Sequence, residues 1–332
     1  MPAPLRLGIV GCSGHVGYVL GALGALADQV RLVAVAPGGP DEDLAALRAA
    51  PEAAGARAYD DYTAMLADAG LDLLAVTPHF YRHAAVSLAG LRHGCAVFCE
   101  KPLALTLHEL DTLRGGQQSS GRPLGMMLDA RYAPPFYTAR RSVAAGVLGE
   151  VVAGYAQKSY KLGTRPDFYT RRATVGGLIP WVGIHAIDWF AYVSGRRYTA
   201  VAAHHGNRGA DAYPELENFA TCQFTLDNDG SAVMSFDYLR PAGAPGHGDD
   251  RLRLVGTRGV LEIRDGALQV LTADGEHPVE LATPPFGLFA DFVQAVRDPA
   301  HAPLVTTDDA FAVTAVALRA RDAADRGTRI AL

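Results

Sequence analysis

The sequence predicts an α/β fold that begins with a doubly wound parallel sheet. In residues 5–113, short apolar runs typical of buried strands alternate with stretches of helical periodicity, which is the pattern of a sheet covered by helices on both faces. A glycine-rich turn, Gly11 to Gly17, joins the first strand to the first helix. Because 332 residues exceed the usual length of one domain, we expect two domains, residues 1–123 and residues 124–332.

The composition excludes several classes of protein. Hydrophobic residues make up 49% of the chain and charged residues 20%, which are values typical of a globular protein. The formal net charge of -5 gives no reason to expect a nucleic acid or an anionic membrane as a partner. No apolar stretch approaches the roughly 18 residues of a membrane span. The apolar run Leu5–Val10 is too short to be the core of a secretory signal.

Cysteine and histidine usage argues against disulfides and metal. The chain contains four cysteines, namely Cys12, Cys95, Cys99 and Cys222. They form no CxxC pair and are too few for a disulfide framework, so a cytoplasmic location is expected. His204 and His205 are adjacent on a predicted strand and point to opposite faces, and His247 has no partner at ligand spacing. We therefore expect no metal.

Each element of the first half has a local signal. Strands are expected at Leu5–Val10, Arg31–Ala36, Leu71–Val76 and Ala96–Cys99. Helices are expected at Tyr18–Ala27, Tyr62–Ala69, His83–His93 and Thr106–Leu113. Thr106 and Glu109 have the spacing of a capping box. Ligands of such sheets bind at the carboxyl ends of the strands, where the glycine turn, Thr77-Pro78 and Glu100-Lys101-Pro102 all fall.

The glycine turn is a candidate binding site for a pyrophosphate. Glycine permits a tight turn and a close approach of backbone N–H groups to an anion at the start of a helix. The contacts are expected from Gly11, Ser13, Gly14, His15 and Val16. The motif is GxxGxxG rather than the usual GxGxxG, since Ser13 stands where the second glycine would fall. A glycine turn without a ligand is the alternative.

The ribose contact of a dinucleotide is also unusual. An acidic residue normally ends the second strand, whereas this chain has Ala36-Pro37-Gly38-Gly39 there, with neither an acid nor an adjacent arginine. Pro37 is therefore placed beside the ribose. The acidic residues at 41–43 are interpreted as the cap and first turn of a helix. The expected cofactor is NAD or NADP, with NAD preferred.

Two groups of residues resemble the signatures of the Gfo/Idh/MocA family, the group of glucose–fructose oxidoreductase and inositol dehydrogenase. The first group is Thr77-Pro78, His83 and the strand end Glu100-Lys101-Pro102. The second is Gly176-Gly177 followed by Gly183-Ile184-His185 and Asp188. The resemblance covers essentially the whole chain. It implies a Rossmann domain followed by an α/β domain with a large, open, mostly antiparallel sheet.

The activity implied by the resemblance is NAD(P)-dependent oxidation or reduction of a sugar, cyclitol or related polyol. Lys101 and His185 are the implied catalytic residues beside the nicotinamide, and Thr77, Pro78, His83 and Glu100 are expected around the cofactor. Hydride transfer from an alcohol needs a partner for the alcohol proton. A partly buried lysine and a histidine that titrates near neutral pH suit this task.

One departure from the family pattern concerns Trp181, which stands where the family often has an acid. Asp188 or another residue compensates for the missing acid, or the reaction differs. Trp181 itself is expected either to stack on a sugar or to belong to the core. Further substrate contacts are expected from Arg131, Lys161, Arg165, Tyr169 and Asp188. The cations among them would suit an acidic or phosphorylated substrate.

The second half is expected to hold mostly strands. They are expected at residues 150–160, 198–204, 217–226, 231–238, 251–255, 260–264 and 267–271. Helices are expected at residues 286–296 and 309–326, the last packing back on the first domain as in the family. An open sheet face favours a homodimer or homotetramer. Two other functions stay open: a nicotinamide-assisted hydrolase or lyase, and a non-catalytic nucleotide or sugar sensor.

Overall fold

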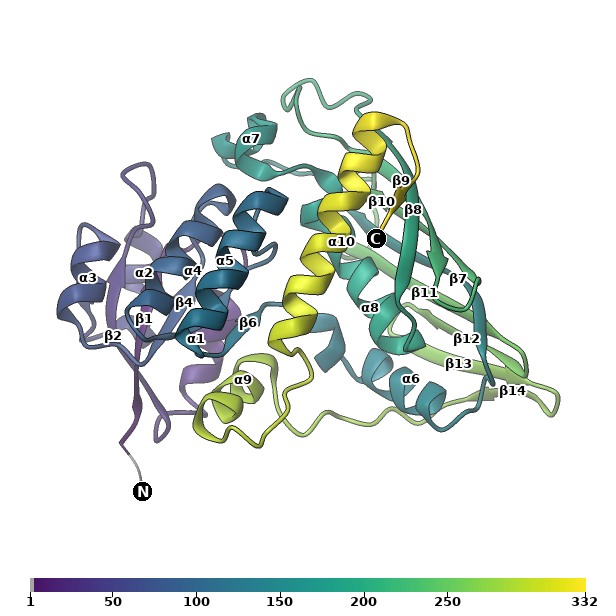
Figure 1. The fold of residues 1–332 in the computed structure, drawn as a ribbon, viewed down its shortest axis with the longest axis horizontal. Coiled ribbons are helices and arrows are strands. Elements are labelled where there is room, and N and C mark those ends of the chain that lie inside the picture. Colours follow the sequence, from purple (N-terminus) through teal and green to yellow (C-terminus); the bar gives the residue numbers. More distant parts are fainter. Residues whose placement is uncertain (1–2) are drawn as a thin grey trace. The chain divides into compact units, whose positions relative to one another are not determined.

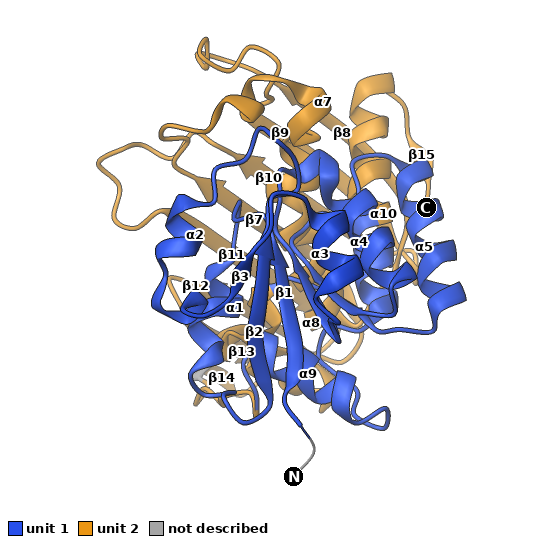
Figure 2. Cartoon of the chain, turned by 90° about the vertical axis from the view of Figure 1, so that its left-hand side faces the viewer, with its two compact units in different colours: residues 1–128, 286–314 blue, residues 129–285, 315–332 orange. Residues whose placement is uncertain are grey.

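The computed structural model describes residues 3–332, apart from the side chains of residues 277 and 278. The chain forms two compact units (Figure 2). Unit 1 comprises residues 1–128 and 286–314, and unit 2 comprises residues 129–285 and 315–332. The sequence placed a single boundary between residues 123 and 124, whereas the chain leaves unit 1 after Leu128 and returns to it at Phe286.

Unit 1 contains a parallel sheet of six strands, as predicted. The strand order is β3-β2-β1-β4-β5-β6. The strands are β1 (Leu5–Val10), β2 (Val30–Ala36), β3 (Arg57–Ala58), β4 (Leu73–Val76), β5 (Ala96–Cys99) and β6 (Leu124–Met126). β4, β5 and β6 are buried along their whole length, as expected where helices cover both faces of a parallel sheet. The two-residue edge strand β3 has no apolar run and was not predicted.

Helices cover both faces of this sheet. They are α1 (Gly17–Leu23), α2 (Ala45–Ala49), α3 (Tyr62–Asp68), α4 (His83–Arg92) and α5 (Leu107–Ser120), with short 3-10 turns at Pro51–Ala53 and Phe80–Arg82. α4 packs against α3 and α5 on one face, while α1 lies on the other face with α9 (Leu288–Arg297) (Figure 2). The predicted capping box is confirmed, because Thr106 accepts from the Glu109 N–H and Glu109 accepts from the Thr106 N–H.

Segment 286–314 joins unit 1 through aromatic packing and hydrogen bonds. Phe292 of α9 stacks on Phe98 of β5 with ring centroids 5.0 Å apart. The Thr307 hydroxyl, at the start of α10 (Thr307–Arg326), donates to the Leu124 carbonyl over 2.9 Å. Residues 307–314 of this C-terminal helix belong to unit 1, and the remainder belongs to unit 2.

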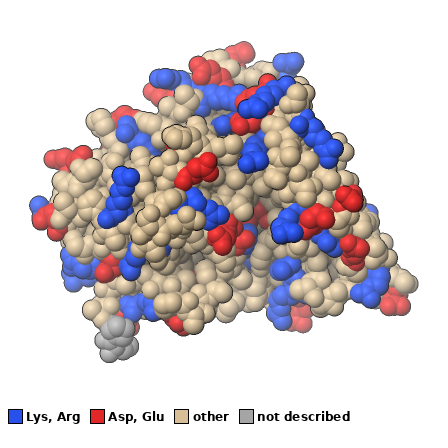
Figure 3. All heavy atoms as spheres, in the orientation of Figure 1, with Lys and Arg blue, Asp and Glu red and all other residues tan. Residues whose placement is uncertain are grey.

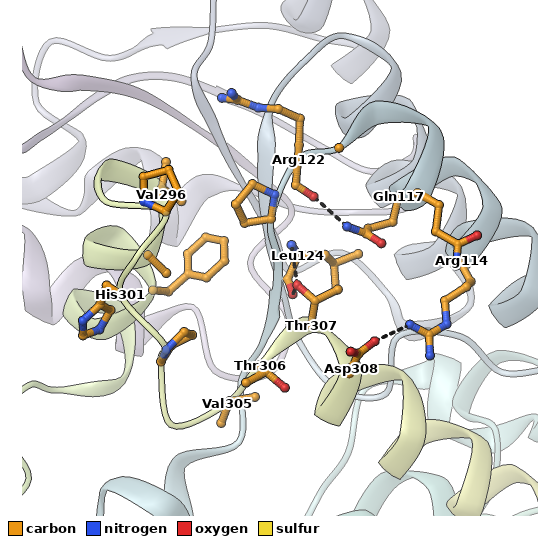
Figure 4. A pocket seen from close by; sticks show the side chains of 17 residues that line it. Arg114, Gln117, Arg122, Leu124, Val296, His301, Val305, Thr306, Thr307 and Asp308 are labelled. Carbon is orange, nitrogen blue, oxygen red and sulfur yellow. Dashed lines mark hydrogen bonds and ion pairs between the residues drawn. The ribbon is translucent and has the colours of Figure 1, made fainter.

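A pocket of about 640 Å³ opens in unit 1 between α5, α9 and the start of α10 (Figure 4). Arg114 pairs with Asp308 at 2.8 Å on one side of it, and Gln117 donates to the Arg122 carbonyl on another. Leu124, the first residue of β6, also lines the pocket. The pocket therefore lies at the amino end of the sheet, away from the carboxyl ends where ligands of such folds bind.

Unit 2 contains a nine-stranded sheet of mixed, mostly antiparallel strands, as predicted. The strand order is β14-β13-β12-β11-β7-β10-β9-β8-β15, and among the described strands of this sheet only β7 and β10 pair in parallel. The strands are β7 (Val151–Tyr160), β8 (Tyr198–Gly206), β9 (Phe219–Leu226), β10 (Ser231–Asp237), β11 (Gly248–Gly256), β12 (Gly259–Arg264), β13 (Ala267–Thr272), β14 (Gly275–Pro278) and β15 (Ile330–Ala331). The short edge strands β14 and β15 were not predicted.

Helices of unit 2 cover one face of this sheet and leave the other open. The helices are α6 (Pro134–Ala144), α7 (Arg172–Val175) and α8 (Ile184–Ser194), with 3-10 turns at Asp129–Tyr132 and Asp167–Thr170 and a π-helical turn at Ile179–Gly183. α6 and α8 pack against each other and against the sheet (Figure 1). On the opposite face, Thr221, Gln223 and Val233 alternate with buried neighbours and are exposed.

Residues 3–332 include no helix with both the length and the apolar character that a membrane crossing requires. On the face drawn in Figure 3, basic and acidic side chains are interspersed. This mixture agrees with the small net charge of -5.

Candidate functional site

The glycine turn lies at the carboxyl end of β1, where the backbone conformation requires glycine. Gly11 has a φ of 74°, and a Cβ there would lie 2.3 Å from the Pro78 Cα. Gly14 has a φ of 68°, and a Cβ there would lie 2.7 Å from a Glu100 carboxylate oxygen. The Ser13 N–H donates to the Thr77 carbonyl over 2.7 Å. The turn that follows β1 is therefore built against the turns that follow β4 and β5.

Glu100 is the buried anchor of this turn. One carboxylate oxygen accepts from the His15 N–H at 2.6 Å and lies 2.8 Å from the His15 ring Nδ1. The other oxygen accepts from the Lys101 N–H at 2.9 Å. Burial alone would raise the pKa of the Glu100 carboxyl, but His15, with Lys101 and His83, outweighs burial and holds the pKa below its usual value. A charged Glu100 thus fixes both the glycine turn and the backbone of Lys101.

His83 connects the turns after β4 and β5. Its ring nitrogens Nδ1 and Nε2 lie 2.7 Å from the Pro102 carbonyl and 3.2 Å from the Pro78 carbonyl. The side chain is fully buried, and burial lowers its pKa. His83 and Glu100 were predicted around the cofactor. In unit 1, His83 contacts the backbone of the turns after β4 and β5, and Glu100 contacts His15 in the turn after β1 and the Lys101 N–H. Lys101 follows Glu100 directly, is buried, and precedes Pro102 through a cis peptide bond.

The end of β2 corrects one interpretation of the sequence. Residues 41–43 were interpreted as the cap and first turn of a helix, but α2 begins only at Ala45, and of these three only Asp43 accepts a hydrogen bond from it. Glu42 instead folds back to the end of β2, where its carboxylate accepts from the N–H groups of Gly38 and His79. Asp41 pairs with Arg82 at 2.7 Å. Asp41 and Glu42, which lie a few residues beyond the end of β2, therefore bring two carboxylates back to the strand end that holds Pro37.

In unit 2, the candidate residues lie along one stripe of α8 and the π-helical turn before it. Trp181, His185 and Trp189 are spaced by four residues, which places them on one helix face. Gly183 lets this segment approach the sheet, since a Cβ there would lie 2.8 Å from the Phe236 ring. Trp181 is buried and meets Tyr169 edge to face, with ring centroids 6.3 Å apart.

Asp188 forms a buried ion pair with Arg131. The Arg131 guanidinium donates to the Asp188 carboxylate through Nε at 3.0 Å and Nη2 at 2.6 Å. Both residues were predicted as substrate contacts, and the structure brings them together. Asp188 was also one residue expected to compensate for the missing acid at Trp181. Its engagement with Arg131 makes it a structural partner of the turn at Asp129–Tyr132.

Asp129 is a candidate that the sequence did not single out. One of its carboxylate oxygens lies 3.6 Å from His185 Nδ1, and the carboxylate is partly exposed. It approaches the histidine from the 3-10 turn that opens unit 2. The only signal in the sequence was its position two residues before Arg131, because the contact with His185 spans residues far apart in the chain.

Lys158 and Asp250 form a second pair missed by the sequence. They face each other in the register of β7 and β11, and the Lys158 ammonium lies 2.6 Å from the Asp250 carboxylate. The ammonium also lies 4.6 Å from the Tyr160 ring centroid and 5.1 Å from that of Trp189. Burial raises the pKa of Asp250; Lys158 offsets part of this effect, and the nearby carboxylate of Asp129 adds to it.

Lys161, Arg165 and Tyr169 come together in the loop after β7. The Lys161 ammonium donates to the Ala244 carbonyl at 2.5 Å, and Arg165 donates to the Lys161 carbonyl at 3.1 Å. The Arg165 guanidinium lies 5.6 Å from the Tyr169 ring centroid. The three residues predicted here thus form one cluster, and through Tyr169 it reaches Trp181.

The histidines considered for metal binding have other partners. His205 Nε2 lies 3.1 Å from Asp325, and His247 stacks on Tyr160 with ring centroids 4.8 Å apart. Within residues 3–332, no three His, Cys, Asp or Glu side chains are grouped as metal ligands.

The predicted residues therefore fall into two sets. Those at the carboxyl ends of the parallel strands belong to unit 1, and they are Gly11, Ser13, Gly14, His15, Val16, Pro37, Thr77, Pro78, His83, Glu100 and Lys101. Those near the stripe of α8 belong to unit 2, and they are Arg131, Lys161, Arg165, Tyr169, Trp181, His185 and Asp188. The first set suits a nucleotide, and the second offers proton-transfer and hydroxyl-binding groups.

Two family models match the chain. The oxidoreductase family model for an NAD-binding Rossmann fold matches residues 5–126, and the GFO/IDH/MocA C-terminal domain matches residues 136–262. Among curated relatives, inositol 2-dehydrogenase 2 of Saccharopolyspora erythraea is 27% identical over 82% of this chain and 76% of its own length. D-glucoside 3-dehydrogenase of Escherichia coli is 30% identical over 58% of this chain and 55% of its own length.

Solved structures agree with this assignment. A Thermotoga maritima protein described as a candidate oxidoreductase is 38% identical, with a TM-score of 0.93 over 99% of this chain and 100% of that chain. An inositol dehydrogenase homologue of Azotobacter vinelandii, solved with NAD+, has a TM-score of 0.83 over 100% of this chain and 98% of that chain. At 19% identity, this second likeness concerns the fold.

Proposed function

Because the chain belongs to the GFO/IDH/MocA family of oxidoreductases, we propose that it is an NAD-dependent dehydrogenase of a sugar, a cyclitol or a related polyol. The observation that carries the proposal is the assembly of three turns at the carboxyl ends of β1, β4 and β5, where ligands of such sheets bind, together with the buried Lys101 in the turn after β5. The curated relatives that act on inositol and glucosides support the substrate class.

The glycine turn fits a dinucleotide. Pro78 and Glu100 leave no room for a Cβ at Gly11 and Gly14, so glycine lets this turn pack closely at the strand ends where a pyrophosphate would bind. Asp41 and Glu42 favour NAD, because carboxylates at the end of β2 oppose the extra phosphate of NADP. When bound, NAD supplies the acceptor for the hydride.

The proton of the substrate hydroxyl is assigned to Lys101 and His185. Glu100 holds the backbone of Lys101 from one side, and His83 fixes the carbonyl of Pro102 on the other. Asp129 lies 3.6 Å from His185 Nδ1, and in this proposal it orients the imidazole ring for the proton transfer. In this arrangement Asp129 takes the place of the acid that is absent at Trp181.

The chain is further proposed to act as a homodimer or homotetramer through the open face of the nine-stranded sheet, where Val233 and Leu271 are exposed. The cytoplasm is the proposed location, because Cys12, Cys95, Cys99 and Cys222 are all free thiols.

The first experiment is a titration of the purified protein with NADH and with NADPH, followed by nicotinamide fluorescence. We expect saturable binding of NADH and weaker binding of NADPH. Formation of NADH from NAD is then measured with myo-inositol, glucose and methyl glucosides as substrates. Binding of neither nucleotide contradicts the proposal and favours a sensor. Product formation without net NADH would favour the nicotinamide-assisted hydrolase or lyase.

A further inference from the structure

The face of the nine-stranded sheet that α8 covers, here called the wall of unit 2, lies against the helix that holds His185 and has several cationic side chains on it or in the loop after β7. They are Lys158, Lys161 and Arg165. Lys158 and Tyr160 lie on the face of β7 that α8 covers, and Tyr238 follows the neighbouring strand β10 at the same level. His247 stacks on Tyr160. Burial lowers the pKa of His247, and Arg165, Lys158 and Lys161 lower it further. The Lys161 N–H donates to the His247 carbonyl over 3.1 Å, and the Lys158 ammonium lies 4.6 Å from the Tyr160 ring on which His247 stacks, so cations of β7 and of the loop after it lie close to this histidine.

The carboxylates of this wall balance only part of that charge. Asp250 pairs with Lys158 at 2.6 Å, and Asp129 faces His185 at 3.6 Å. Asp249, on the open face of β11, pairs with Arg240 and Arg251. In the part of the chain that the structure describes, the side chains of Lys161 and Arg165 form no ion pair, and they donate hydrogen bonds only to the carbonyls of Ala244 and Lys161.

Arg165 is held in place while part of its donor set stays unused. Its backbone N–H donates to the Tyr213 hydroxyl at 2.6 Å, and its guanidinium lies 5.2 Å from the Tyr238 ring centroid. Nη2 is engaged, but Nε is buried and has no hydrogen-bond partner among residues 3–332. A buried donor without a partner costs free energy, and an acceptor on a ligand would remove that cost.

We propose that Lys161 and Arg165 bind a carboxylate on the substrate, so that the preferred substrate is a sugar acid, a uronate or an aldonate, rather than a neutral sugar. This inference rests on the proposed dehydrogenase function. A planar guanidinium matches a carboxylate in geometry, and charge-assisted hydrogen bonds are stronger than neutral ones. A single negative charge fits better than a doubly charged phosphate, because Asp129 and Asp250 lie on the same wall. Asp250 Oδ1, which has no partner among the described residues, is available to a substrate hydroxyl.

Tryptophan fluorescence tests the proposal without turnover. Trp181 contacts the cluster of Lys161, Arg165 and Tyr169 through Tyr169, and Trp189 lies beside Lys158, so both tryptophans of the chain lie near the proposed site. The protein is titrated with matched pairs of sugars that differ only in the carboxylate: D-glucose and D-glucuronate, D-galactose and D-galacturonate. D-gluconate and glucose 6-phosphate complete the set. We expect at least one sugar acid to bind about tenfold or more tightly than its neutral counterpart, as charge-assisted bonds imply.

Variants of Arg165 and Lys161 test whether these two residues cause the tighter binding of the sugar acid. Arg165→Met and Lys161→Met are each expected to lower the affinity for the sugar acid about tenfold, while the affinity for the neutral sugar and for NADH stays unchanged. Arg264→Met is the matched control, because Arg264 lies at the exposed end of β12 and pairs with Asp265. It is expected to change none of these affinities.

Several results would overturn the proposal. One is equal affinity for each sugar acid and its neutral counterpart, or no saturable binding of any sugar acid. Another is an Arg165→Met variant that loses affinity for the sugar acid and for the neutral sugar to the same extent. A third is tighter binding of glucose 6-phosphate than of every sugar acid. A sugar acid that binds through Arg165 but reduces no NAD would contradict the proposed dehydrogenase while leaving the carboxylate site in place. The two failures are therefore distinguishable.

Discussion

Lys101 follows the buried strand β5 and is itself buried, in a position that Glu100 and Pro102 define from either side. We expect Lys101→Met to lower kcat by orders of magnitude and to leave the affinity for NADH nearly unchanged, because the turn contacts of Glu100 and His83 stay in place. Steady-state kinetics and NADH titration measure the two quantities. Normal turnover at saturating NAD, with only the affinity for the cofactor reduced, would remove Lys101 from the proposed chemistry.

Asp41 is expected to influence the preference of the chain for NADH over NADPH. The hydrogen bond from Tyr81 and the charge of Arg82 hold the pKa of Asp41 well below its usual range, so its carboxylate is charged and occupies the Arg82 guanidinium. Asp41→Ala should release Arg82 beside Gly39 at the end of β2 and raise the affinity for NADPH relative to NADH several-fold.

Fluorescence titration of both nucleotides measures this ratio. Asp43→Ala is the control, since it removes the same charge from the same loop but caps α2 instead of binding Arg82. An unchanged ratio in Asp41→Ala, or an equal rise in both variants, would contradict a specific role for the Asp41–Arg82 pair.

At the scale of elements, Glu100 couples the end of β5 to the turn after β1. Its pKa is lowered in the folded state, so its contribution to stability is present above the unfolded value of about 4.5 and is lost as the pH falls through the folded value. Glu100→Gln should therefore be less stable than wild type by about 3 kcal/mol at pH 7, the usual cost of breaking a buried charged pair. The difference should shrink below pH 4.5.

Urea unfolding followed by circular dichroism, from pH 7 to pH 3, measures this dependence. Glu262→Gln serves as the control, because Glu262 pairs with Arg253 on an exposed strand face, where ion pairs contribute little. If the free energy of unfolding of Glu100→Gln stays lower than that of wild type by the same amount down to pH 3, the loss of stability comes from packing rather than from the charge.

At the scale of the whole molecule, the open face of the nine-stranded sheet is the surface through which we expect copies of the chain to associate. Val233 is 45% exposed at the centre of this face, on β10. We expect a dimer or tetramer by light scattering coupled to size-exclusion chromatography. Val233→Asp should lower the native mass, because a charge at the centre of an apolar contact is costly. Val147→Asp, in the loop after α6, should leave the mass unchanged. A monomeric wild type would contradict the expected oligomer.

The sequence by itself determined the elements that depend on local signals. The parallel sheet follows from short apolar runs such as Leu73–Val76, and the start of α5 follows from the capping box of Thr106 and Glu109. The glycine turn and Lys101 were found by their place after buried strands. Such signals lie within a few residues of the feature they predict, so a single sequence suffices to find them.

Only the tertiary structure decided which distant groups meet. Glu42 returns to the end of β2, Asp129 reaches His185, and Asp250 pairs with Lys158 across strands that are remote in the chain. The contact of Arg165 with the Lys161 carbonyl, and of Lys161 with Ala244, likewise depends on loop conformations. The physical reason is that strand order, register and loop paths minimise the free energy of the whole fold, and no local pattern encodes the partners that they bring together.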